Sequence, residues 1–149
     1  MWTRILISDW VIIVSANVVN LLVALVFVAR ARKRELLEWW LGLFVVLMGA
    51  PVLLAALWNL SRGREAWTVY LPGILIAYLV AEFVLDYWLK ISFRSNVLLW
   101  PYIVLFYAGQ IAMISYASLI KRQLGLVTLA TYFVSLGATW WANRQTRTS

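Results

Sequence analysis

The chain has 149 residues, of which 64% are hydrophobic and 13% charged, and its formal net charge is +7. Charged residues make up roughly a quarter of an ordinary soluble domain, so a water-soluble fold of this size could not hide so much apolar surface. Cysteine and histidine are both absent, which excludes thiol nucleophiles, disulfides, the usual metal ligands and a histidine general base. The totals predict an integral membrane protein with one domain, residues 1–149, and with no cofactor or metal site.

The first apolar segment begins close to the start of the chain, in MWTRILISDWVIIV. This start lacks the layout of a secretory signal, because Asp9 and Trp10 interrupt the apolar run and the run continues to Val28. We therefore expect a retained first helix that covers about residues 9–29 and ends at the basic sequence ARARKRE.

Four further segments are each close to the length that a transmembrane helix needs, about 20 residues. Charge clusters or short Gly and Ser turns separate them, and they cover about residues 36–60, 67–91, 99–120 and 124–142. The strict alternation of a β-barrel is absent, and in lipid a helix bonds all its backbone groups internally. The sequence therefore predicts an all-α, polytopic bundle of five transmembrane helices.

Tryptophan and basic residues predict how this bundle lies in the membrane. Most of the ten tryptophans fall near a predicted span end, where this side chain anchors at the head-group level. With the N-terminus outside, more Lys and Arg residues fall on the cytoplasmic side than on the other side. The positive-inside rule then favours an N-out/C-in orientation, and we expect the plasma (inner) membrane as the location.

The stretch AEFVLDYWLK places ionisable residues inside the third predicted span. Tyr78, Glu82, Asp86 and Lys90 recur every four residues and should form a continuous stripe on one helix face. Asp86 and Lys90 lie near the predicted inner membrane interface. A structural acid–base pair at the helix end explains their presence there as well as a functional site would. Glu82 lies deeper, where a carboxylate costs about 3 kcal/mol, so it is the stronger functional candidate.

Polar residues on other spans are the expected partners of Glu82. Asn17 and Asn20 lie on one face of the first helix, and Tyr107 and Gln110 lie on one face of the fourth. The fifth carries a hydroxyl stripe, which consists of Thr128, Thr131, Tyr132, Ser135 and Thr139. Such groups often only join helices in lipid, but four polar helix faces together indicate a shared polar interior.

The second span has no polar stripe and is interpreted as a packing helix. Gly42, Gly49 and Ala56 recur every seven residues, which lets a neighbouring backbone come close, and Pro51 should kink the helix.

A basic run follows the first span and accounts for part of the positive charge. It contains Arg30, Arg32, Lys33 and Arg34. Because basic residues cluster at the ends of apolar segments, they indicate topology and contact with anionic lipid headgroups, and we expect no nucleic-acid partner.

Three functions remain open. A transporter or channel for a proton, a cation or a small solute needs a polar route with a charged group, and so small a bundle would work as a homo-oligomer. A lipid-modifying or lipid-binding enzyme would have to use Glu82 and Asp86, and a non-catalytic accessory subunit of a larger membrane complex needs no site. We expect the transporter or channel, rather than an enzyme, with a route lined by Tyr78, Glu82, Asp86, Lys90, Asn17, Asn20 and Gln110.

Overall fold

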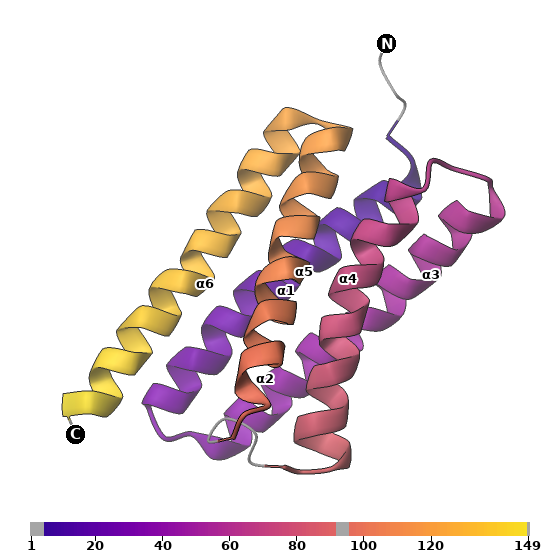
Figure 1. Cartoon of the computed structure of the whole chain (residues 1–149). Helices are drawn as coiled ribbons and strands as arrows, with labels where there is room; N and C mark the ends of the chain where they lie inside the picture. Colours follow the sequence, from indigo (N-terminus) through magenta and orange to yellow (C-terminus); the bar gives the residue numbers. More distant parts are fainter. Residues whose placement is uncertain (1–4, 92–95, 149) are drawn as a thin grey trace.

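The computed structural model describes residues 5–91 and 96–148, which are helical apart from short connections (Figure 1). The elements are α1 (Ile7–Ala31), α2 (Glu35–Leu47), α3 (Gly49–Ser61), α4 (Trp67–Glu82), the π-helix η1 (Phe83–Trp88), α5 (Leu99–Ile120) and α6 (Arg122–Thr148). Because α2 with α3 and α4 with η1 each form one long segment, five segments are long and apolar enough to cross a membrane. The predicted all-helical chain with five such spans is confirmed.

The observed spans differ from the predicted ones mainly at their ends. They cover Ile7–Ala31, Glu35–Ser61, Trp67–Trp88, Leu99–Ile120 and Arg122–Gln145. Apolar composition marks only the lipid-sized part of a helix, whereas backbone hydrogen bonds continue into the polar flanks. The third span instead ends earlier than the expected residue 91, because Lys90 has a φ of 49° and leaves the helix.

The first helix is the central element of the bundle. It packs against α2, α3, α5 and α6, while α4 lies between α3 and α5. Figure 1 shows α1 crossing the bundle obliquely, with the α3–α4 connection and the α5–α6 turn at the end where α1 begins. We call this end the Asp9 end, and the opposite one, where α1 and α6 finish, the Glu82 end.

Apolar side chains fill the middle of the bundle and also cover its outside. Ile12, Leu75 and Met113, from α1, α4 and α5, belong to one buried apolar cluster, whereas Val14 and Leu21 of α1 are exposed. Helices that are apolar all round are typical of membrane spans. It is therefore the polar residues that mark the inner face of each helix.

The second span is interrupted where a proline removes a backbone hydrogen bond. α2 ends and α3 begins at Met48, three residues before Pro51. A proline has no N–H, and its ring clashes with the carbonyl four residues earlier, which here belongs to Leu47. The interruption lies where the sequence predicts a kink, and Gly49 beside it lets Leu79 of α4 come to 3.4 Å from the position of a Cβ.

The turn between α5 and α6 depends on Gly125, so its replacement tests the fold. A Cβ on Gly125 would lie 2.9 Å from Cα of Ser118, and overpacking of this kind costs about 1–3 kcal/mol. We expect Gly125→Ala to lower the free energy of unfolding by that amount, measured by denaturant unfolding in detergent.

Gly137 provides the matched control in the same helix. Nothing lies within 4 Å of a Cβ added there, and alanine stabilises a helix interior by up to about 1 kcal/mol relative to glycine. Gly137→Ala should therefore be neutral or stabilising. A Gly125→Ala protein as stable as the wild type would contradict the close α5–α6 contact.

Candidate functional site

A cavity of about 430 Å³ lies inside the bundle at the Glu82 end, and we call it the Glu82 hollow. Its volume is within the usual range for small-molecule sites, roughly 300–1,000 Å³. All five spans contribute to its wall, which consists of Val23, Val26, Phe27, Arg30, Gly42, Val45, Tyr78, Glu82, Leu99, Tyr102, Ile103, Phe106, Tyr107, Leu136, Thr139 and Asn143. The hollow is therefore an interior space of the whole bundle.

A second cavity of about 200 Å³ continues the Glu82 hollow towards the surface, and we call it the acidic mouth. It shares Val26, Arg30, Gly42 and Glu82 with the hollow, and its other lining residues are Glu35, Glu38, Trp39, Asp86 and Tyr87. Four of the six acidic residues of the chain thus line one small space. Among the described residues, no group of three or more acidic side chains is arranged to hold a metal ion.

The π-helix places the acidic residues of α4 and η1 at this mouth. Glu82 is the last residue of α4, and the N–H of Leu89 donates to the carbonyl of Val84 (2.8 Å), five residues earlier. A π-turn holds more residues than an α-turn and is frequent at functional sites. The continuous four-residue stripe that the sequence predicts is therefore wrong beyond Asp86, because Lys90 is exposed and outside the helix, and lines neither cavity.

One wall of the acidic mouth forms where α2 meets η1. The hydroxyl of Tyr87 donates to the carbonyl of Trp39 (3.0 Å), and the two rings are 5.8 Å apart. Gly42 makes this contact possible, since a Cβ there would collide with the Tyr87 hydroxyl. A larger side chain at position 42 would therefore intrude where mouth and hollow join.

Aromatic rings line the inner part of the hollow. Tyr78 is buried, its hydroxyl lies 3.3 Å from that of Tyr102, and its ring packs edge-on against Phe106 at 5.2 Å. Tyr78 lies one helical turn from Glu82, so α4 presents a carboxylate near the mouth and an aromatic ring deeper in the hollow.

The amides predicted to share this interior instead join α1 to α6. Thr131 donates to Oδ1 of Asn17 (2.7 Å), and Nδ2 of Asn20 donates to Thr131 (3.0 Å). Nδ2 of Asn17 also donates to Thr128 (3.2 Å). Interhelical hydrogen bonds of this kind stabilise helix packing in lipid. The structure therefore brings Tyr78, Glu82 and Asp86 together, but not these amides, and Gln110 is buried on α5 outside both cavities.

The basic run after α1 is divided between the site and the surface. Arg30 lines both cavities, and its Nη2 lies 2.6 Å from Oε1 of Glu38. Arg32, Lys33 and Arg34 are exposed at the Glu82 end. Contact with anionic lipid stays a prediction for these three, whereas Arg30 has an internal partner.

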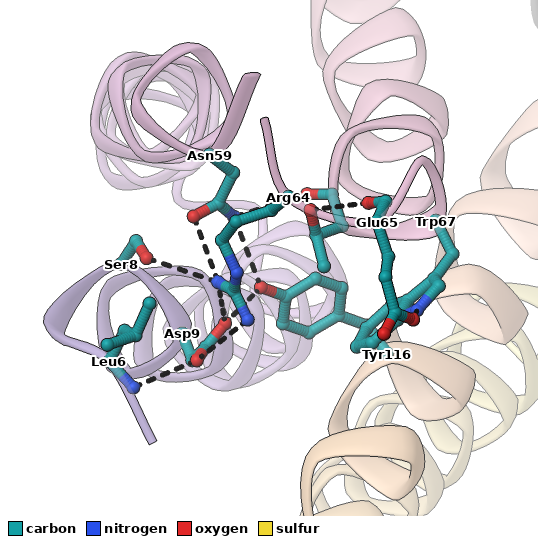
Figure 2. Close-up of polar contacts among 9 residues, drawn as sticks. Leu6, Ser8, Asp9, Asn59, Arg64, Glu65, Trp67 and Tyr116 are labelled. Atoms are coloured by element: carbon teal, nitrogen blue, oxygen red, sulfur yellow. Dashed lines mark hydrogen bonds and ion pairs between the residues drawn. The ribbon is translucent and has the colours of Figure 1, made fainter. Parts of the chain in front are cut away.

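A buried ion pair at the Asp9 end was not singled out from the sequence (Figure 2). Nη1 and Nη2 of Arg64 lie 2.7 and 3.3 Å from the two carboxylate oxygens of Asp9, which has 0% exposure. Tyr116 of α5 donates to the same carboxylate (2.6 Å), as does the backbone N–H of Leu6 (2.9 Å). The buried charge of Asp9 is therefore compensated on several sides.

The α3–α4 connection aims Arg64 at this carboxylate. Gly63 takes a φ of 62°, and the N–H of Arg64 donates back to the carbonyl of Asn59 (3.1 Å), which is the glycine-dependent end that many helices share. Nη1 of Arg64 also donates to Oδ1 of Asn59 (3.0 Å). Burial alone lowers the pKa of Arg64, but the hydrogen bond and charge of Asp9 outweigh it and raise the pKa above its ordinary value.

This polar network lies at the Asp9 end of the bundle, beside two further cavities of about 700 and 560 Å³. It joins α1, α3, the α3–α4 connection and α5, as Figure 2 shows. The sequence analysis missed this pair because membrane topology alone explains charges near the ends of spans. An aspartate within an apolar run, together with an arginine expected at the same end of the bundle, was the signal that could have indicated it.

Comparisons with protein-family models, with curated proteins and with solved structures find no match for this chain. The geometry of its two ends is therefore the basis for any functional inference.

The Asp9–Arg64 pair should contribute strongly to stability. Asp9→Asn leaves a largely buried guanidinium without its counter-charge, and a loss of about 3 kcal/mol is expected. Glu38→Gln is the control, because the side chains of the Arg30–Glu38 pair are 30% and 26% exposed, so its loss should be about 1 kcal/mol or less. Denaturant unfolding in detergent measures both.

The double variant Asp9→Asn with Arg64→Gln adds a second check. Because it removes both charges, it should be more stable than Asp9→Asn alone. Equal losses for Asp9→Asn and Glu38→Gln would show that the buried pair contributes no more than a surface pair.

Proposed function

We propose that the protein is a membrane transporter or channel that moves a small cationic species, and that the Glu82 hollow is its binding site. The observation that supports this most is the position of Glu82, in a cavity to which all five spans contribute. An ionisable residue at such a place in a membrane bundle is a candidate for an ion or substrate pathway.

The outward surface supports a location in a membrane. Large apolar side chains are exposed along every span, whereas a soluble monomer rarely exposes so much contiguous apolar surface. Trp10, Trp58, Trp88, Trp100 and Trp140 are exposed near helix ends, as expected at the head-group level. The basic residues of the Glu82 end favour its placement in the cytoplasm, with an N-out/C-in orientation in the plasma (inner) membrane.

The difference between the two ends favours a carrier over an open channel. The Glu82 end contains the hollow and its mouth, whereas the Asp9–Arg64 network joins the helices at the other end, and no residue of that network lines the hollow or the mouth. Carriers that work by alternating access open their site to one side at a time. The arrangement is consistent with the inward-open state of such a cycle.

Ion flux into liposomes tests this proposal. Protein in phosphatidylcholine–phosphatidylglycerol liposomes should dissipate an imposed gradient of protons or of radiolabelled tetramethylammonium faster than empty liposomes do. Glu82→Gln removes the charge at nearly constant shape and should reduce the flux to the level of empty liposomes. A trapped pH-sensitive dye and the radiolabel report the two fluxes.

Glu65→Gln is the matched control for this experiment. Glu65 is an exposed acid at the Asp9 end, where it accepts a hydrogen bond from Trp67, and it lines neither the hollow nor the mouth. Its flux should equal that of the wild type. Wild-type flux at the level of empty liposomes, or undiminished flux in folded Glu82→Gln, would overturn the proposal.

A further inference from the structure

We infer that the Glu82 hollow binds an amphipathic organic cation, with its ammonium group at Glu82 and its apolar body among the aromatic rings. This inference rests on the same site as the proposed function and names the class of solute that the site takes.

The charge of the lining selects a cation. Glu35, Glu38, Glu82 and Asp86 line the acidic mouth, although the chain as a whole has a formal charge of +7. Among the described residues that line the mouth or the hollow, Arg30 is the one basic side chain, and Glu38 holds its guanidinium at 2.6 Å. Within the described lining, four acidic side chains against one basic side chain favour a cation over a carboxylate or phosphate ligand.

The walls of the hollow select an organic body over a simple metal ion. Phe27, Tyr78, Tyr102, Phe106 and Tyr107 all line it. Small inorganic cations need several oxygen ligands at short distances, which a cavity of about 430 Å³ with largely apolar walls does not supply. Aromatic faces, in contrast, attract ammonium groups and bury hydrocarbon, as in sites for quaternary amines.

The position of Glu82 joins these two requirements. It lines both cavities, so a cationic group at its carboxylate lies where the acidic mouth meets the aromatic hollow. The rings of Tyr78 and Phe106, 5.2 Å apart, lie deeper and are placed to receive the body of the ligand. The mouth then provides a path along which negative charge attracts the cation.

The test is equilibrium dialysis of the full chain in a neutral detergent. Three ligands share a benzyl group and carry a cationic, a neutral or an anionic substituent: benzyltrimethylammonium, benzyl alcohol and phenylacetate. The wild type should bind the ammonium at least about tenfold more tightly than the other two, a factor that one well-placed charge interaction supplies. Benzyl alcohol bound as tightly as the ammonium, or a preference for phenylacetate, would overturn the inference.

Variants then locate the ligand within the site. Glu82→Gln should weaken ammonium binding at least about tenfold, Phe106→Leu roughly threefold through the lost ring face, and the distant control Glu65→Gln not at all. Undiminished binding in folded Glu82→Gln contradicts the inference. If Glu82→Gln does not fold, Gly42→Leu replaces it as the test, because the leucine side chain would fill the junction of mouth and hollow. Loss of ammonium binding in this variant supports the inference, and unchanged binding overturns it.

The outcomes separate this inference from the proposed transport. Selective ammonium binding without any gradient dissipation supports the ligand class and overturns the transport proposal. Flux that depends on Glu82 without ammonium binding supports the transport proposal and overturns the ligand class.

Discussion

The structure depends on one constraint: a polar side chain in a bundle with an apolar exterior needs a partner inside the protein. Asp9 shows how this constraint is met, since a guanidinium, a phenol and a backbone N–H all donate to its carboxylate. The side-chain amide of Asn17 and the amide nitrogen of Asn20 meet it through threonines of α6. An unpaired charge or amide costs several kcal/mol in such surroundings. These contacts therefore determine which helices pack together and how they are positioned along the bundle axis.

Seen in this way, the two ends of the bundle use polar groups differently. At the Asp9 end, Arg64 contacts both Asp9 and Asn59 directly and joins three segments of the chain. At the Glu82 end, acids and aromatic rings surround a space that is large enough for a small molecule. Direct hydrogen bonds within a network hold its side chains in place, whereas side chains that line a cavity present a surface to it. The polar groups of the two ends therefore differ in what surrounds them.

Sequence reasoning predicted the helices better than the site. Length and apolar composition were sufficient for five spans, because a membrane permits few alternatives. Glu82 and Asp86 were conspicuous as charges in an apolar run, and Tyr78 as a polar group one turn away; the structure places all three at the two cavities. The residues around them were not predictable. Helices that are apolar on all sides lack the hydrophobic periodicity that would show which face points inward, and the π-turn changes the helical register after Glu82. Asp9 and Arg64 are 55 residues apart in sequence, so only the packing of α1 and α3 shows that they meet.

The break at Met48 gives the second span two mechanical parts. α3 is fixed to the Asp9 end, because Asn59 bonds Arg64 and the backbone of Thr68. α2 carries Glu35, Glu38 and Trp39 of the mouth, and Pro51 removes a backbone hydrogen bond between the two halves. The two halves of the second span therefore serve different surroundings: α3 contributes Asn59 to the Asp9 network, and α2 contributes one wall of the acidic mouth. A single proline thus separates, within one span, the part that belongs to each end of the bundle.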